Sequence, residues 1–232
     1  MKVISLATVP HTGTRLLKEF FLNVPEGMPM MQDLEALSRN RTLLHGKDGE
    51  GLNPKSNNLV VGHLYPHCLS TIQTLAQFWQ PITTLRDPLL TAITYHFRTT
   101  DPEMVKKTRE GRTDPIFMAY MWTTFLWSFL PMKPFVFAVD LLGDYKARKS
   151  ALTAALKAAD LRDDQKYVKK FAQEWPTVNS SGSYPLKDMY YNNDLAAIEA
   201  EIPTQVALLR TLEKDLRPIL EQHGYKDLLW WS

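Results

Sequence analysis

Cysteine is almost missing from this sequence, in which Cys68 is the single cysteine among 232 residues. One thiol cannot close a disulfide within the chain, and it cannot supply a cysteine metal cluster. A disulfide-stapled fold and a cysteine zinc site are therefore excluded for the chain by itself. Histidine, aspartate and glutamate do not recur at metal-ligand spacing either, so we expect no metal site. The reducing cytoplasm suits such a composition, and we expect a cytoplasmic protein.

Long apolar runs and a strong net charge are also lacking. The first apolar run, residues 3–7, is too short for a signal peptide, and the stretch 117–130 is interrupted by Thr and Ser and is shorter than a bilayer span. The formal net charge is only +2, so no global field attracts nucleic acid or an anionic membrane. We expect a soluble protein with no membrane span and no nucleic-acid partner, in which any anion site is local.

Short apolar runs alternate with helical patterns along the chain. The runs are apolar nearly throughout, which is typical of parallel strands covered on both faces, and they lie at residues 3–7, 59–61, 81–85 and 135–139. Helical periodicity follows at residues 14–22, 69–79, 89–97, 114–129, 145–159 and 203–223. This order predicts a P-loop-like three-layer α/β/α fold with a central parallel sheet and a helical C-terminal part. No linker divides the chain, so we expect one domain over residues 1–232.

Two segments carry no such pattern. Residues 23–58 are rich in Pro, Gly, Asn and charge, and they are interpreted as an irregular excursion. Residues 179–184, Asn-Ser-Ser-Gly-Ser-Tyr, have the composition of a second loop.

A candidate anion cradle follows the first predicted strand at residues 9–15, Val-Pro-His-Thr-Gly-Thr-Arg. A tight glycine loop that opens a helix points successive backbone N–H groups and the positive end of the helix dipole at a ligand. Thr12 and Thr14 add hydroxyl donors, and Arg15 adds a guanidinium fork. The loop lacks the lysine pattern of an ordinary P-loop, which disfavours a nucleoside triphosphatase. The alternative is a plain turn in which Thr12 caps the helix.

A second candidate site follows the third predicted strand. Arg86 stands at the carboxyl edge of this strand, where ligands bind in open α/β sheets, and Thr94 comes eight residues later on the next helix. A guanidinium and a hydroxyl so placed can reach the same phosphate group.

The two segments together resemble the PAPS-dependent sulfotransferase family, whose donor is 3′-phosphoadenosine 5′-phosphosulfate. Residues 10–14 match the family's Pro-x-[Ser/Thr]-Gly-Thr loop, and Arg86-Asp87-Pro88 with Thr94 matches its Arg-[Asp/Asn]-Pro motif with a later serine. The resemblance implies that Pro10, His11, Thr12, Gly13 and Thr14 bind the 5′-phosphosulfate, and that Arg86 and Thr94 bind the 3′-phosphate. Residues 137–144 are similar to the family's strand–[Glu/Asp]-Asp-Leu–helix segment, with Val139 at the first acidic position.

His63, at the end of the second predicted strand, is similar in place to the histidine that acts as general base in many members. An attacking hydroxyl must lose its proton, and a neutral imidazole titrates near the working pH. A histidine packed at the sheet edge is the alternative, and His67 is a nearby competitor for the role.

The sequence departs from the family at three points. His11 stands where many members carry a lysine that supports the leaving phosphate oxygen, so we assign His11 a catalytic place, with Arg15 as the other source of positive charge. Leu16 stands at the usual adenine-stacking position. From the late segment 181–187, Lys187 is the candidate for the family's basic residue over the nucleotide, and a solvated surface lysine is the alternative.

The resemblance implies transfer of a sulfuryl group from PAPS to an acceptor hydroxyl, with adenosine 3′,5′-bisphosphate (PAP) as product. The acceptor is a small molecule or a glycan, and sugar, lipid, phenol, polyketide and peptide tyrosine all stay open, as does the oligomeric state. A basic run at residues 106–112 is either a solvated face or a contact for an anionic acceptor. The rival functions are a small kinase-like phosphotransferase and a non-catalytic nucleotide-binding protein on the same fold.

Overall fold

The computed structural model describes residues 2–25, 29–39, 51–103, 105, 114–178 and 184–232. Five strands form one sheet in the order β2-β3-β1-β4-β5, and every paired neighbour is parallel. The strands are β1 (Val3–Thr8), β2 (Met30–Asp33), β3 (Asn58–His63), β4 (Ile82–Leu85) and β5 (Phe135–Ala138). The predicted parallel α/β sheet is thereby confirmed, and the carboxyl ends of all five strands meet at one edge.

Alternate side chains of β1 enter the two hydrophobic cores of the molecule. Ile4 and Leu6 pack into one core, whereas Val3 and Ala7 pack into the other. All six residues of β1 are buried between the two cores, and this explains why the strand is apolar at every position except Ser5 and Thr8.

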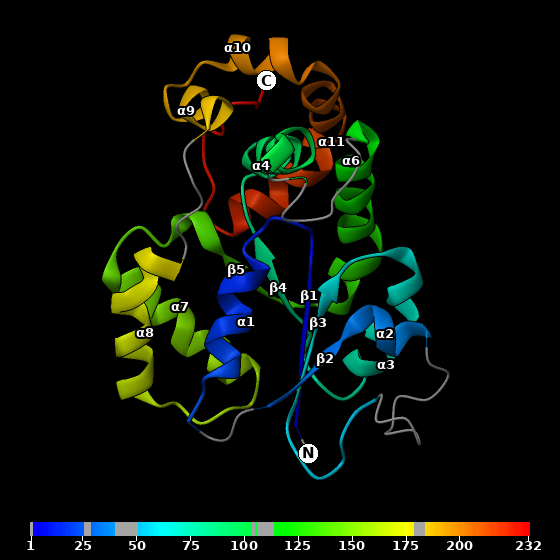
Figure 1. Cartoon of the computed structure of the whole chain (residues 1–232), viewed down its shortest axis with the longest axis vertical. Helices are drawn as coiled ribbons and strands as arrows, with labels where there is room; N and C mark the ends of the chain where they lie inside the picture. The colour runs from blue at the N-terminus through cyan, green and yellow to red at the C-terminus, as the bar shows by residue number, and fades with distance from the viewer. Residues whose placement is uncertain (1, 26–28, 40–50, 104, 106–113, 179–183) are drawn as a thin grey trace.

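Helices cover both faces of the sheet and continue beyond its carboxyl edge. The core that contains Ile4 and Leu6 lies under α1 (Thr14–Leu22), α7 (Tyr145–Ala158) and α8 (Gln165–Val178). The core that contains Val3 and Ala7 includes side chains of α2 (Leu34–Arg39), α3 (Leu69–Ala76), α4 (Pro88–Thr100) and α6 (Pro115–Thr124). The helical C-terminal part continues through α9 (Pro185–Tyr191), α10 (Leu195–Glu201) and α11 (Pro203–Gln222). In Figure 1, α4, α9, α10 and α11 lie above the carboxyl ends of the strands.

The interpretation of residues 23–58 as irregular was wrong in part, because β2 and α2 lie within this range. In β2 only Gln32 is buried, so this edge strand carries no apolar run that the sequence could reveal. In the short helix α2, two residues, Leu34 and Leu37, are buried.

Other boundaries differ less. The predicted helix at residues 114–129 contains α6 and then one π-helical turn, Phe125–Phe129. Lys187, expected in a loop segment, lies on α9. Residues 179–183 of the second loop and residues 106–112 of the basic run lie outside the described residues.

None of the helices that the structure describes is long and apolar enough to cross a bilayer. The same described residues contain no group of three or more His, Cys, Asp or Glu side chains arranged to hold a metal ion.

Candidate functional site

The loop between β1 and α1 has a backbone shape that requires its glycine. Gly13 has φ of 103°, in the left-handed region, and a Cβ atom there would lie 2.8 Å from Cγ2 of Val139. His11 also has a positive φ, 64°, which histidine tolerates better than most residues. The loop is thus held tightly against the end of β5, and α1 begins at Thr14 without a side-chain cap on Gly13. Uncapped N–H groups at such a terminus favour an anion.

Thr12 fixes the loop to the sheet. Its hydroxyl donates to the carbonyl of Val9 at 2.6 Å and lies 2.7 Å from Oγ1 of Thr84 on β4, and the residue is fully buried. Pro10 is buried as well. The Thr12 side chain therefore serves the loop structure, and an anion would meet the backbone here rather than this hydroxyl.

Thr14 and His63 are brought together through a residue that the sequence analysis missed. Oγ1 of Thr14 lies 2.5 Å from Oγ1 of Thr8, which in turn lies 3.4 Å from Nδ1 of His63. Burial lowers the pKa of His63, and this effect is opposed first by a hydrogen bond to the backbone of Thr8 and then by the carboxylate of Asp33 at the end of β2. His63 is consequently neutral at neutral pH, which is the form that accepts a proton. The available signal for Thr8 was a polar residue that ends an apolar strand.

Arg86 connects the two predicted motifs. Its Nη1 donates to the carbonyl of His11 and to Oγ1 of Thr94, each at 3.3 Å, and its Nε donates to Oδ1 of Asp140 at 3.1 Å. Oγ1 of Thr94 also lies 2.9 Å from the hydroxyl of Tyr184, the residue just before α9. Sequence reasoning had assigned no role to Asp140 or Tyr184, whose contacts depend on the packing of distant segments.

Positive charge gathers around this cluster. The pKa of His11 is lowered to about 3 by burial first, and then by the charges of Arg98, His63 and Arg86. The pKa of Lys187 is lowered by burial and by Arg86, and its Nζ lies 5.9 Å from the ring centre of Tyr184. His11 is therefore neutral at neutral pH, while Arg98, which the sequence analysis missed, provides a permanent charge beside it.

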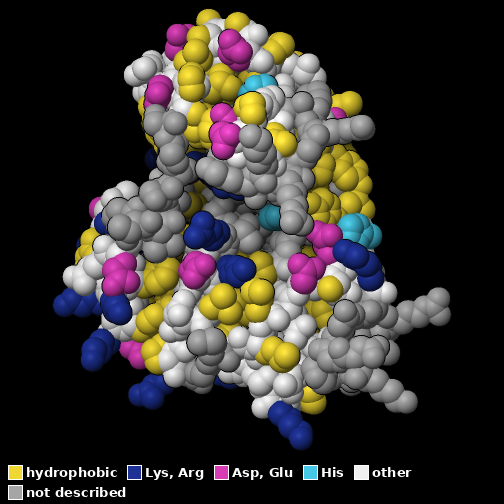
Figure 2. All heavy atoms as spheres, viewed as in Figure 1, with side chains coloured by type: hydrophobic (Ala, Val, Ile, Leu, Met, Phe, Trp, Pro, Cys, Tyr) yellow, Lys and Arg dark blue, Asp and Glu magenta, His cyan; other side chains and the backbone are white. Residues whose placement is uncertain are grey.

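Arg15 is the predicted residue that the structure does not bring to this cluster. Its side chain is exposed on the first turn of α1. Figure 2 shows a hollow between the upper helices and the body below, with Lys or Arg side chains and a histidine visible in it.

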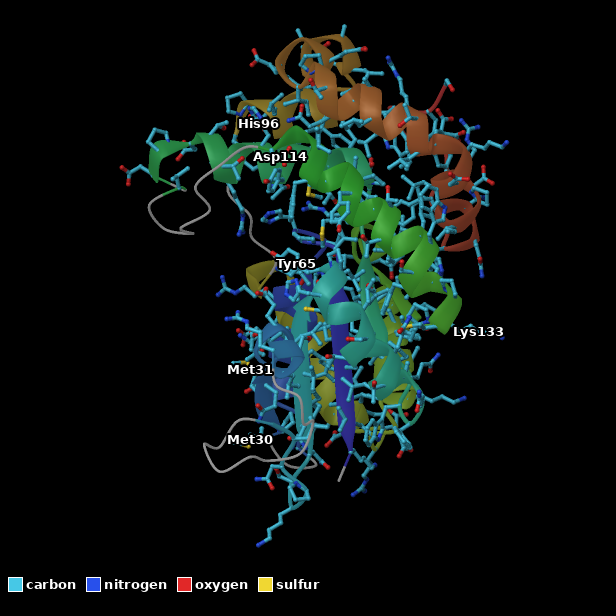
Figure 3. All side chains as sticks on the ribbon, turned by 90° about the vertical axis from the view of Figure 1, so that its right-hand side faces the viewer. Met30, Met31, Tyr65, His96, Asp114 and Lys133 are labelled. Atoms are coloured by element: carbon cyan, nitrogen blue, oxygen red, sulfur yellow. The ribbon has the colours of Figure 1, made fainter. Side chains whose placement is uncertain are left out.

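Aromatic rings adjoin the two histidines of the site. Measured between ring centres, His63 meets Tyr65 edge-on at 6.0 Å, and Tyr65 lies 6.3 Å from Phe117. Phe117 in turn stacks on Tyr95 at 5.3 Å, and Tyr95 lies 5.8 Å from His11. In Figure 3, Tyr65 lies at the carboxyl end of the sheet, below α4 and α6. A group of aromatic side chains of this kind suits the ring of a small ligand.

No protein-family model and no curated protein matches this sequence. Among solved structures, the fold is similar to the crystal structure of the mouse sulfotransferase SULT7A1 complexed with PAP, with a TM-score of 0.48 and 15% sequence identity. The match covers 78% of this chain and 66% of that chain, just under two thirds of its length. At this level of similarity, any function has to be argued from the geometry of the site.

Proposed function

We propose that this chain is a sulfotransferase that moves a sulfuryl group from PAPS to an acceptor hydroxyl. The observation that carries the proposal is the position of Arg86, whose Nη1 lies 3.3 Å from both the His11 carbonyl and Oγ1 of Thr94. One guanidinium thus joins a phosphate-type loop to a second anion-binding segment. A donor with phosphate groups at both its 5′ and its 3′ positions fits two adjacent anion sites.

In this assignment the 3′-phosphate binds to Arg86 and Thr94, with the Tyr184 hydroxyl and Lys187 beside them. The 5′-phosphosulfate binds in the loop of Pro10, His11, Thr12, Gly13, Thr14 and Arg15, chiefly through backbone N–H groups at the start of α1. Because the loop histidine is neutral, Arg98 and Arg86 supply the fixed positive charge that a leaving phosphate needs.

His63 is the general base in this reaction. As the acceptor oxygen forms its bond to sulfur, the acceptor proton passes to the imidazole, and the bond between sulfur and the bridging phosphate oxygen breaks. The electron pair of the broken bond stays on the phosphate oxygen of PAP, so charge and atoms balance. The surroundings of His63 keep it neutral before the step, which is what a base requires.

A second function is favoured by one specific observation, the neutral His11 in a loop that has no lysine. A loop with less positive charge stabilises a departing phosphate less well, and a protein that binds the nucleotide without transfer has no need of that stabilisation. PAP binding combined with no transfer to any acceptor distinguishes this function from the first.

Calorimetric titration with PAP, beside ATP, tests the proposal. We expect PAP to bind and ATP to bind at least tenfold more weakly, and Arg86→Gln to weaken PAP binding by about tenfold or more. Arg210→Gln is the matched control, because Arg210 is also paired with a carboxylate, that of Glu199 at 2.7 Å, but lies on α11. A wild-type protein that prefers ATP contradicts the proposal and favours the kinase-like alternative. A wild-type protein that binds neither nucleotide contradicts both functions.

Transfer itself is tested with sulfur-labelled PAPS and a panel of phenols, sugars and glycans. We expect wild-type protein to label one acceptor class and His63→Gln to lose most of that transfer while still binding PAP. Equal transfer by wild type and His63→Gln would show that His63 is not the general base.

A further inference from the structure

Three side chains form a line from the candidate phosphate loop to the candidate base. The two contacts, 2.5 Å from Thr14 to Thr8 and 3.4 Å from Thr8 to Nδ1 of His63, run through a threonine that is fully buried. The parallel register of β1 and β3 pairs Thr8 with His63, and the backbone N–H of Leu64 donates to the Thr8 carbonyl at 3.0 Å. The sheet itself therefore fixes the position of the Thr8 hydroxyl beside the imidazole.

The hydrogen-bond capacity of these groups allows two directions. A hydroxyl donates one bond and accepts up to two, and a neutral imidazole carries its proton on one nitrogen only. If Thr8 donates to Thr14, it accepts from Nδ1–H, and the lone pair on Nε2 is free to take a proton. If Thr8 donates to Nδ1 instead, Nε2 carries the proton and His63 cannot act as base through it.

An anion in the loop selects the first direction. The Thr14 hydroxyl lies on the first turn of α1, and an anion bound there accepts a hydrogen bond from it. Thr14 then accepts from Thr8, and Thr8 accepts from Nδ1 of His63. When Nε2 takes up the acceptor proton, the Nδ1–H bond becomes charge-assisted, so the same line of donors stabilises the imidazolium.

We propose that Thr8 is a positioning residue, which makes His63 a base at Nε2 when an anionic donor occupies the loop. This inference rests on the proposed function and adds the connection between donor binding and the state of the base. The distance of 3.4 Å is long for a hydrogen bond, and catalytic contacts of this kind commonly shorten when the ligand binds.

Two other titratable groups act on His63 or respond to its charge, and both have to be considered in a test. Burial has the largest effect on the pKa of His63 and lowers it, whereas a hydrogen bond to the backbone of Thr8 and the charge of Asp33, at the end of the neighbouring strand β2, raise it. His11 lies in the loop, where burial first and then the charges of Arg98, His63 and Arg86 lower its pKa to about 3. Neither group changes when the Thr8 side chain is replaced, and the backbone of Thr8 that bonds to His63 is retained, so an effect of the replacement reports on the hydroxyl.

The test is long-range ¹H–¹⁵N NMR of the imidazole groups, with PAP as the probe. The chain has six histidines, and the signals of His63 are identified by their loss in His63→Gln. In wild-type protein we expect saturating PAP to move His63 to the tautomer protonated at Nδ1. In Thr8→Val we expect PAP to bind still, the tautomer change to be absent, and the His63 pKa to be lower by about one unit. Thr8→Ser should restore both.

Ser5→Ala is the matched control, because Ser5 is buried on the same strand and its hydroxyl has no hydrogen-bond partner among the residues that the structure describes. It should change neither the tautomer nor the pKa of His63. A wild-type His63 that stays protonated at Nε2 with PAP bound overturns the inference without any variant. A folded, PAP-bound Thr8→Val with wild-type spectra overturns it as well. Absence of PAP binding by wild-type protein instead overturns the proposed function, and the inference with it.

Discussion

The guanidinium of Arg86 and the carboxylate of Asp140 form an ion pair at 3.1 Å, at the point where β4 and β5 both end. The second carboxylate oxygen accepts the backbone N–H of Asp87 at 2.8 Å. Asp140 therefore holds Arg86 toward Thr94 and at the same time satisfies a backbone donor. Both partners of the pair are largely shielded from water, with 15% and 24% of their side-chain surfaces exposed.

Asp140→Ala should destabilise the protein by about 2–4 kcal/mol, because it leaves a shielded guanidinium and a backbone N–H without their acceptor. Asp140→Asn should cost less, because its carbonyl oxygen still accepts one of the two bonds. Urea denaturation measures both. Asp163→Ala, at an exposed carboxylate that accepts from Gln165, is the control and should change the free energy of unfolding little. Equal stability of wild type and Asp140→Ala would contradict the structural role of the pair.

Arg98 lies one helical turn after Thr94 on α4, and helical side chains lean back toward the N-terminus of their helix. Its charge acts on both His11 and Tyr184. Within the described part of the chain, no carboxylate forms an ion pair with it. Its charge is thus available to a bound anion.

Arg98→Gln should therefore weaken PAP binding by about tenfold, and Arg98→Lys should retain most of the affinity. Calorimetry at low and high salt checks this, and the difference from wild type should shrink at high salt because the charge is partly exposed. Lys214→Gln, at an exposed cation on α11, is the control. Unchanged PAP affinity in Arg98→Gln would show that this charge does not face the nucleotide.

Gly13→Ala combines two unfavourable effects. The backbone at φ 103° disfavours any side chain, and the new methyl group meets Cγ2 of Val139 at 2.8 Å. We expect a loss of about 2–3 kcal/mol in the free energy of unfolding. The double variant Gly13→Ala with Val139→Ala separates the effects, because it relieves the contact but not the backbone strain. If the double variant is no more stable than expected from the two single changes, the clash with Val139 is not the cause.

The sheet was predictable from sequence because short, mostly apolar runs mark four of its strands, and two of these, β1 and β4, are buried along their whole length. β2 was not, since an edge strand with one buried residue, Gln32, looks like a loop. Arg86 and Thr94 were found because their spacing places both near one strand end, and the structure does bring them together. Their assignment to a 3′-phosphate stays a prediction.

Thr8, Tyr184 and Asp140 were missed for a common physical reason. Each acts through a contact between segments far apart in sequence, and no local pattern encodes such a contact. Arg98 is different, since it follows Thr94 by four residues, just beyond the predicted helix at residues 89–97, and that spacing was a usable signal. The neutral state of His11 also depends on burial and on neighbouring cations, which only the folded chain shows.

Asp87, next to Arg86 in sequence, is a buried carboxylate that accepts three hydrogen bonds. It accepts from the indole of Trp230 at 2.9 Å, from the Tyr190 hydroxyl at 2.5 Å and from the backbone N–H of Leu89 at 2.8 Å. Burial, its largest influence, raises its pKa from 3.8 to about 6, although these hydrogen bonds act to lower it.

This raised pKa predicts how stability depends on pH. The folded state binds the Asp87 proton more tightly than the unfolded state, so the contribution of Asp87 is most favourable below pH 4, falls between pH 4 and pH 6, and is constant above that. Asp87→Asn removes the titration and keeps an oxygen acceptor. Relative to wild type, its free energy of unfolding should therefore rise by about 3 kcal/mol between pH 4 and pH 7. Urea denaturation at four or five pH values measures the difference, and a difference that does not vary with pH would show that Asp87 titrates normally.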